Sequence, residues 1–237
     1  MVRRTVKRKL AAGKRTTVDQ NQASAGAMMA EVKKFAQPFF KGVRGSHDWE
    51  HTLRVSRLCR RIGPAEDVDM TVLMIAAYLH DIGRYHQDRS KGAVCHAEEG
   101  VKIAGPIIGS LPLDPERKEN IIHCIRAHRF RGENRPRTRE ARVLFDADKL
   151  DAIGAVGVAR AFLFAGEVGA TLHNPGIDVE ETRPYSRDDT GFREYKVKLS
   201  KISKRILTPE GRKLARRRHA FMKNFFDRFL EEYEGKG

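Results

Sequence analysis

Residues 76–88, AAYLHDIGRYHQD, place His80 and Asp81 side by side at the end of an apolar run. Imidazole and carboxylate together suit a divalent transition metal. Inside a regular helix, adjacent side chains point about 100° apart and would not meet at one ion. At the frayed last turn of a helix they need not diverge, so both could converge on a cation that neutralises the aspartate. The pair therefore predicts a metal site if other ligands reach it.

Candidate ligands are concentrated in one part of the chain. Seven of the nine histidines lie within residues 47–128. The stretch LFDADKLDAIG adds three aspartates to an otherwise apolar helical pattern, and a buried acid is costly unless it is paired or bound to a cation. One mixed sphere could use His51, His80, Asp81 and Asp148. With fewer than six protein ligands, positions remain for water and a phosphate oxygen, which is the open site that a hydrolase requires.

The motifs HDWEHTLRV, LHDIGR and DADKLDAIG carry these residues in the order His51, His80-Asp81, Asp148. This order resembles the HD superfamily of metal-dependent phosphohydrolases. Within it, SKGAVCHAEEG, IRAHRFRG and the tail TPEGRKLARRRHAFMKNFFDRFLEEYEG resemble the small stand-alone HD hydrolases related to nucleoside triphosphate pyrophosphohydrolases. The resemblance covers about residues 28–235.

The resemblance implies an all-α HD-domain bundle with one divalent ion: Mn, Ni, Co, Mg or Fe. The implied metal ligands are His51, His80, Asp81 and Asp148. Asp146 is the fallback for the last position, and Asp151 is expected to support a ligand from behind. His96 and His128 match positions at which some HD families bind further ions, which leaves room for a second ion. We favour phosphate contact or ligand support for both.

One residue departs from the family pattern. Related HD nucleotidases carry a glutamate four residues after the motif histidine, where it helps to activate water, whereas this chain has Arg84. Arg84 is expected to contact phosphate, and the acid–base duty falls on other groups. The catalytic candidates are Asp81, Asp48 and His96, with Glu98 as a further acid–base candidate.

We expect the ion to lower the pKa of a bound water and to orient a phosphoryl group for in-line attack. Fixed cations stabilise the charge that develops on phosphate oxygens. The expected phosphate-binding residues are Arg84, Lys91, Arg129, Arg131 and His128. The substrate expected is a nucleotide, above all a nucleoside triphosphate, or another small phosphate ester.

The charge distribution supports an alternative. The formal net charge is +15, and it is concentrated in two segments. Residues 1–15 hold seven basic residues and no acid, and residues 196–218 hold ten basic residues and one acid. These segments could contact RNA or DNA, in a nucleic-acid or ribonucleoprotein binding protein with a vestigial HD site. A solvated helix face and a disordered tail explain them equally well. A third alternative is an iron-dependent oxygenase on the same scaffold.

Helical periodicity places the motifs. We expect helices from about residue 46 to 63, 65 to 79, 96 to 109 with an interruption at Gly105-Pro106, 115 to 129, 138 to 165, and from about 190 to 234 with a break at LTPEG. Residues 172–191 are polar and read as a long loop. Alternating strand patterns are nearly absent, so the predicted class is all-α.

The predicted organisation is a basic flexible leader over residues 1–25 and an HD-domain phosphohydrolase over 26–237, which includes the C-terminal helices. The longest strongly apolar run, residues 72–79, is too short for a membrane span, so no membrane partner is expected. Three scattered cysteines suit a reducing compartment. The expected location is the cytoplasm, or an organelle if the leader is a transit peptide.

Overall fold

The computed structural model describes residues 25–43, 47–90, 92–129 and 134–236, and these form helices and loops without a strand. The predicted all-α class is confirmed. The first helix spans residues 25–36. The others are α2 (Trp49–Ile62), α3 (Met70–Leu79), α4 (Arg84–Arg89), α5 (His96–Ser110), α6 (Pro115–Ala127), α7 (Arg139–Asp151), α8 (Gly154–Glu167), α9 (Gly191–Glu194), α10 (Ser200–Ile202) and α11 (Pro209–Tyr233). Short 3₁₀ turns lie at Gln37–Phe40, Gly63–Ala65, Val179–Glu181 and Ser203–Arg205, and a π-helical turn lies at Tyr195–Leu199.

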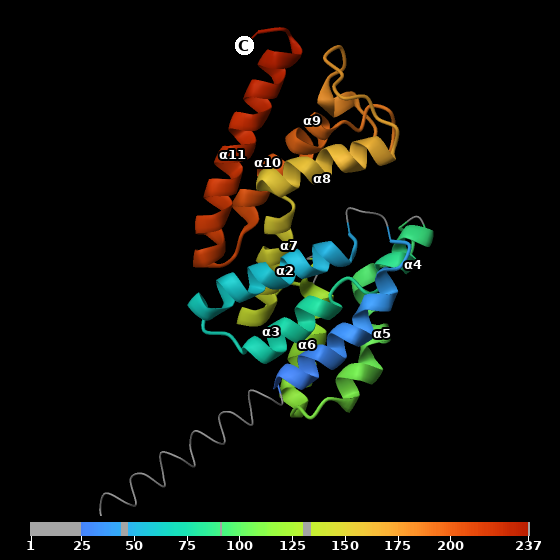
Figure 1. The fold of residues 1–237 in the computed structure, drawn as a ribbon, viewed down its shortest axis with the longest axis vertical. Helices are drawn as coiled ribbons and strands as arrows, with labels where there is room; N and C mark the ends of the chain where they lie inside the picture. The colour runs from blue at the N-terminus through green and yellow to red at the C-terminus, as the bar shows by residue number, and fades with distance from the viewer. Residues whose placement is uncertain (1–24, 44–46, 91, 130–133, 237) are drawn as a thin grey trace, which may run out of the picture.

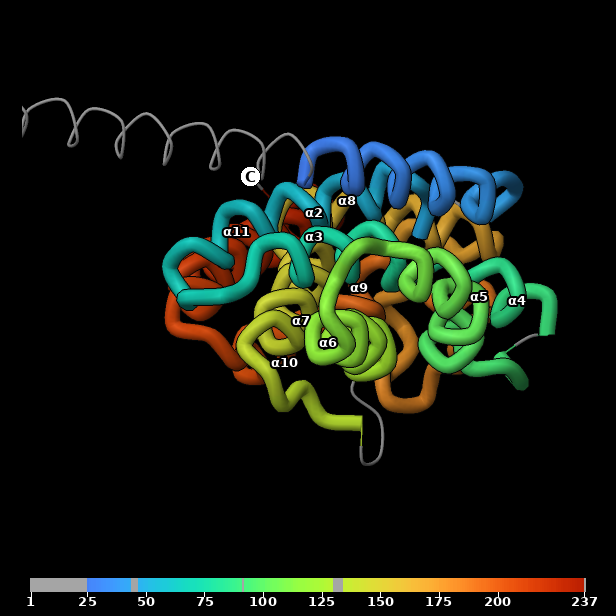
Figure 2. The backbone as a smooth tube through the Cα atoms, turned by 90° about the horizontal axis from the view of Figure 1, so that it is seen from below, coloured from blue at the N-terminus to red at the C-terminus, as the bar shows by residue number. Residues whose placement is uncertain are grey.

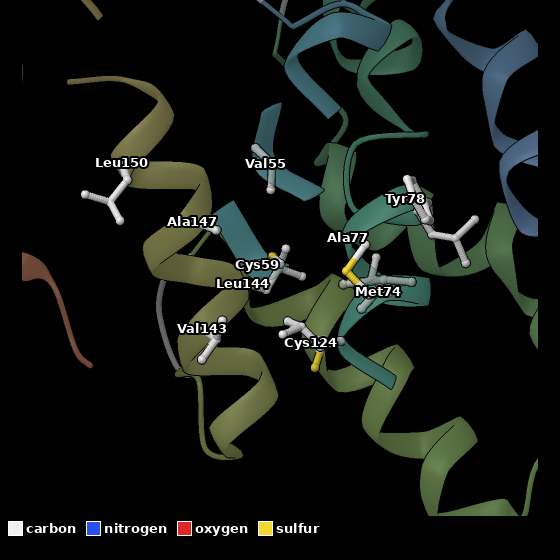
Figure 3. Packing of buried hydrophobic residues seen from close by; sticks show 14 of the residues in the cluster. Val55, Cys59, Met74, Ala77, Tyr78, Cys124, Val143, Leu144, Ala147 and Leu150 are labelled. Carbon is white, nitrogen blue, oxygen red and sulfur yellow. The ribbon is translucent and has the colours of Figure 1, made fainter. Parts of the chain in front are cut away.

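The core lies between α2, α3, α6 and α7. Seen from below in Figure 2, α6 is surrounded by α3, α5 and α7. Figure 3 shows Leu144 and Ala147 of α7 on the side that faces Val55 and Cys59 of α2, whereas Leu150 points to the other side of the helix; all of these residues belong to one buried apolar cluster. Eight consecutive residues of α3, Val72 to Leu79, are buried, so this helix is enclosed on all sides. Because α3 ends inside the core, the His80-Asp81 pair that follows it is buried as well.

Capping aspartates start the two helices that lead to the site. Asp48 precedes α2 and accepts a hydrogen bond from the backbone N–H of His51. Asp69 precedes α3 and accepts from the N–H groups of Thr71 and Val72. The prediction that the second helix begins near residue 65 is therefore wrong by several residues. The start predicted for the first of these two helices, about residue 46, lies outside the described residues, and α2 begins at Trp49.

The expected interruption at Gly105-Pro106 is also wrong, because α5 runs through both residues. Proline removes the hydrogen bond to the carbonyl four residues earlier. Pro106 and Lys102 are both exposed, so water can solvate that carbonyl. The predicted single helix over 138–165 is instead two helices, α7 and α8. Gly154 adopts a φ of +82°, which other residues rarely adopt, and the chain turns there.

The C-terminal helices pack on α7 and α8. Figure 1 shows α11 beside α8 and α9 at one end of the molecule, with α7 leading to them from the bundle. The predicted break at LTPEG is confirmed: Thr208 caps α11, and the helix begins at Pro209. The Asp146 carboxylate accepts hydrogen bonds from Leu207 N, Thr208 N and Thr208 Oγ1 at 2.7–2.8 Å, which joins the start of α11 to α7.

Residues 172–191 are mostly irregular, as predicted. The basic leader falls almost entirely on residues 1–24, which lie outside the described residues, so the division at residue 25 stays a prediction. Among the helices that the structure describes, none combines the length and the apolar character needed to cross a membrane.

Candidate metal centre

His51, His80 and Asp81 come together at the end of α3. Each offers one ligand atom, and these atoms all lie within 4.8 Å of one another. The Nε2 atoms of His51 and His80 are 3.4 Å apart, and Asp81 Oδ2 lies 3.6 Å and 3.8 Å from them. Ligand atoms about 2.0–2.2 Å from one ion are separated by about 3.0–3.6 Å, so the spacing suits a single divalent ion. We call this cluster the first group.

Asp148 adjoins the first group from α7. Its Oδ1 lies 3.4 Å from His51 Nε2, and its Oδ2 accepts a hydrogen bond of 2.5 Å from Lys149 Nζ. The Asp148 side chain is 18% exposed, whereas His51, His80 and Asp81 are buried. This places the open side of the site next to Asp148.

A second group shares Asp81 with the first. Asp81 Oδ1 lies 3.3 Å from His96 Nε2 and 3.5 Å from His128 Nε2, and the two Nε2 atoms are 2.9 Å apart. His96 is the first residue of α5, and His128 directly follows α6. The ends of α3, α5 and α6 therefore meet at the Asp81 carboxylate.

The hydrogen bonds behind the four histidines determine which ring nitrogen faces the site. Each Nδ1 lies 2.6–2.8 Å from an oxygen that can only accept a hydrogen bond, so each neutral imidazole carries its proton on Nδ1. The Nδ1 of His51 faces Asp151 Oδ2, and that of His80 faces Ala77 O. The Nδ1 of His96 faces Gln87 Oε1, and that of His128 faces Ile125 O. Four Nε2 lone pairs and the Asp81 and Asp148 carboxylates then face one another. A cation is the natural partner of such an acceptor cluster.

The electrostatics agree with this donor set. Burial lowers the pKa of His80 to about 4 and that of His96 to about 2, so both rings stay neutral at pH 7. Burial also opposes ionisation of Asp81, but the Arg84 guanidinium outweighs it and holds the pKa of this carboxyl well below its usual range. For His51, burial is outweighed by Asp148 and Asp151, which raise its pKa. An ion would displace that proton.

The three aspartates of α7 have different partners. Asp148 faces His51 Nε2, and Asp151 accepts from His51 Nδ1 at 2.8 Å, as expected for a supporting residue. Arg54 and Arg160 also donate to Asp151. Asp146, the fallback ligand, faces Leu207 and Thr208 instead.

Several predicted substrate-site residues lie near the two groups. Arg84 Nη2 contacts Asp81 and His96, and Arg129 Nη1 donates to Gln87 Oε1 at 3.0 Å. Glu98 faces Arg126 and Asn134 instead. The Asp48 carboxylate caps α2, where it accepts a hydrogen bond from the backbone N–H of His51. Lys91 and Arg131 lie outside the described residues.

Comparison with known proteins agrees with the resemblance of the motifs. Residues 48–153, which contain both groups, match the family model for the HD domain. This part of the chain is similar to an HD domain. It runs from the cap of α2 to the residue before α8, so it includes every helix that supplies a candidate ligand.

The similarity to known proteins extends beyond the matched range. The Bacillus subtilis protein YpgQ is 29% identical over 210 residues, which cover 86% of this chain and 93% of YpgQ. A crystal structure of YpgQ in complex with ADP has a TM-score of 0.67 at 28% identity, covering 88% and 96% of the two chains. A predicted HD superfamily hydrolase from an uncultured Thermotogales bacterium has a TM-score of 0.62 at 29% identity, covering 86% and 92%. Over most of its length the chain is therefore similar to proteins described as HD-superfamily hydrolases, which agrees with the resemblance of the motifs.

Sequence reasoning missed the residues that hold the candidate ligands from behind. Gln87 lies one turn after Arg84 and binds His96, and Arg54 lies one turn after His51 and binds Asp151. Helical spacing could have identified these two. Arg160 comes from α8, and nothing in its local sequence pointed to Asp151.

Proposed function

We propose that this protein is a metal-dependent phosphohydrolase that acts on a nucleotide, first of all a nucleoside triphosphate, or on another small phosphate ester. The observation that carries the proposal is the convergence of four Nε2 lone pairs and two carboxylates on a site with an open side at Asp148. The structure of YpgQ in complex with ADP, on a chain of the same fold, supports a nucleotide as the substrate.

In this proposal His51, His80, Asp81 and Asp148 hold the ion. A divalent ion bound there lowers the pKa of a water and polarises a phosphoryl oxygen. Arg84 and His128 contact Asp81, and Arg129 contacts Gln87, which binds His96. In this proposal these three residues bind the phosphate chain, together with Lys91 and Arg131. Asp81, His96 and Asp48 are the candidates for moving protons. A second ion, if the protein bound one, would lie in the second group.

The test is phosphate or pyrophosphate release from a panel of nucleotides with Mn²⁺, Ni²⁺, Co²⁺ or Mg²⁺. We expect release from at least one nucleotide and its loss in His80→Ala, since this change removes a ligand. His219→Ala, a histidine substitution on α11, is the matched control and should keep full activity. No release from any nucleotide by a protein with its metal bound would refute the proposal. Absence of iron from natively purified protein would exclude the oxygenase alternative.

Nucleic-acid binding remains a second candidate function, and the exposed face of α11 favours it. Arg212, Lys213, Arg216 and Arg217 are all exposed on the first turns of this helix. Phosphate contacts release counterions, so RNA affinity should fall steeply with salt. Affinity measured against salt, for the full chain and for a chain lacking residues 1–25, tests this function. A flat response or no binding would remove it.

A further inference from the structure

Arg84 directs its guanidinium into the second group. It is the first residue of α4 and follows the His80–Gly83 turn. Its Nη2 lies 3.1 Å and 3.3 Å from the two carboxylate oxygens of Asp81, and 3.3 Å from His96 Nε2. The side chain is only 13% exposed. A single nitrogen therefore contacts two of the three members of the second group.

The contact of Arg84 with His96 gives a hydrogen-bond donor to a place where two acceptor nitrogens would otherwise face each other. His96 carries its proton on Nδ1, which faces Gln87, and His128 carries its proton on Nδ1, which faces Ile125 O. Their Nε2 atoms, 2.9 Å apart, cannot bond to each other in these tautomers. Arg84 donates to His96 Nε2 and neutralises Asp81, which is what a second metal ion would do here.

The first group is arranged differently. Apart from Arg84, which contacts Asp81, the described cations beside it bind carboxylates at its edge and not its histidine nitrogens. Lys149 donates to Asp148 Oδ2, and Arg54 and Arg160 donate to Asp151. His51 Nε2 and His80 Nε2 thus keep their lone pairs directed at Asp81 Oδ2 and at each other. Arg84 Nη2 lies 3.1 Å from Asp81 Oδ1 and 3.3 Å from Oδ2, but among the described histidines of the two groups it donates only to His96 Nε2. A divalent ion in the second group would therefore compete with the guanidinium for both Asp81 Oδ1 and His96 Nε2, and like charges repel.

We propose that Arg84 takes the place of a second metal ion. The protein then binds one divalent ion, in the first group, and the second positive charge at Asp81 is supplied by a fixed side chain. The Nε of Arg84 is buried and has no hydrogen-bond partner among the described residues, which leaves a donor for a phosphate oxygen of the substrate. The inference rests on the proposed function for the ion in the first group.

Removing the guanidinium should therefore create a metal site. We expect the wild-type chain to bind one Mn²⁺, measured by native mass spectrometry and elemental analysis, and Arg84→Met to bind two. Because both ions would share Asp81, Arg84→Met should also replace a six-line Mn²⁺ resonance by an exchange-coupled spectrum. The double variant Arg84→Met/His96→Ala should return to one ion, which would place the gained ion in the second group.

Arg89→Met is the matched control, because Arg89 lies on the same helix and binds the exposed Tyr85 hydroxyl. It should bind one ion. If Arg84→Met does not fold, as judged by circular dichroism, Arg84→Gln gives the same comparison. Two ions in the wild-type chain, or one ion in the folded Arg84 variant, would overturn the inference. A wild-type chain without any ion would overturn the proposed function, and this inference with it.

Discussion

Asp146, Asp148 and Asp151 lie within two turns of α7, and each carboxylate faces a different partner atom. Side chains three residues apart lie on neighbouring faces of a helix. Asp148 and Asp151 accordingly flank the two nitrogens of His51, at 3.4 Å from Nε2 and 2.8 Å from Nδ1. Asp146 points to another side and reaches Thr208. One helix thus supplies a candidate ligand, its support and a link to α11.

Asp151→Asn should weaken metal binding by about 10–100-fold, because a ligating histidine depends on the acceptor behind it for its tautomer and orientation. Isothermal titration with Mn²⁺ measures this. The fold will also be less stable, since Arg54 and Arg160 lose their carboxylate partner. An unchanged metal affinity would show that His51 does not need Asp151.

Asp146→Asn is the matched substitution on the same helix. The amide would present a donor to the N–H groups of Leu207 and Thr208, so the free energy of unfolding should fall by about 1–3 kcal/mol. Metal affinity should not change, because Asp146 does not face the site. Denaturant unfolding and the same titration distinguish the two variants, and a loss of metal by Asp146→Asn would contradict this assignment.

The residues that bear the motif chemistry could be predicted, because their types and order are distinctive. The types and order of the motif residues predicted that His51, His80, Asp81 and Asp148 lie together. The structure places the first three in one group and Asp148 Oδ1 3.4 Å from His51 Nε2. The contact of Arg84 with Asp81 and His96 could not be predicted, because it depends on how α4 turns back toward the start of α5.

At the level of helices, the turn between α3 and α4 is held against the start of α5 by a glycine. A Cβ on Gly83 would lie 2.3 Å from His96 O and 2.7 Å from Gly100 N. Both atoms belong to the backbone and cannot rotate away. This close approach is what allows Asp81 to reach His96.

Gly83→Ala should therefore lower the free energy of unfolding by more than about 2 kcal/mol, because the backbones of the turn and α5 must separate. Gly109→Ala is the control within α5, where a Cβ would have no atom within 4 Å outside the neighbouring residues and the helix backbone. Alanine is the better helix former, so this variant should gain about 0.5–1 kcal/mol. Thermal unfolding of both proteins measures the difference, and equal effects would refute the close-packing argument.

The sequence predicted which segments are helical better than it predicted the residues at which the helices begin and end. The interruption at Pro106 and the single helix over 138–165 were wrong for opposite reasons. Proline is tolerated in α5 because it lies on the solvated face of that helix. The chain turns at Gly154, between α7 and α8, although the apolar periodicity continues across the turn. Both outcomes depend on the surroundings of a residue, which local periodicity does not contain.

For the whole molecule, the candidate site lies where several helices end, so an ion would connect segments far apart in the chain. His51 comes from α2, Asp81 follows α3 and Asp148 comes from α7. Any ligand that binds only the folded state stabilises it.

Mn²⁺ at a hundred times its dissociation constant should raise the free energy of unfolding by about 2.7 kcal/mol. For a chain of this size that corresponds to a rise in Tm of about 5–10 °C, and EDTA should reverse it. Differential scanning calorimetry measures the shift. His80→Ala should lose it, and a shift of the same size in that variant would mean that the ion binds elsewhere.

The arrangement of α7 makes the candidate site sensitive to helix register. A slip of one residue would rotate all three carboxylates by about 100°. Asp148 would leave His51 Nε2, Asp151 would leave Nδ1, and Asp146 would release Thr208 in the same movement. Insertions or deletions within Asp146–Asp151 should consequently be far less tolerated than changes in the irregular segment 172–191.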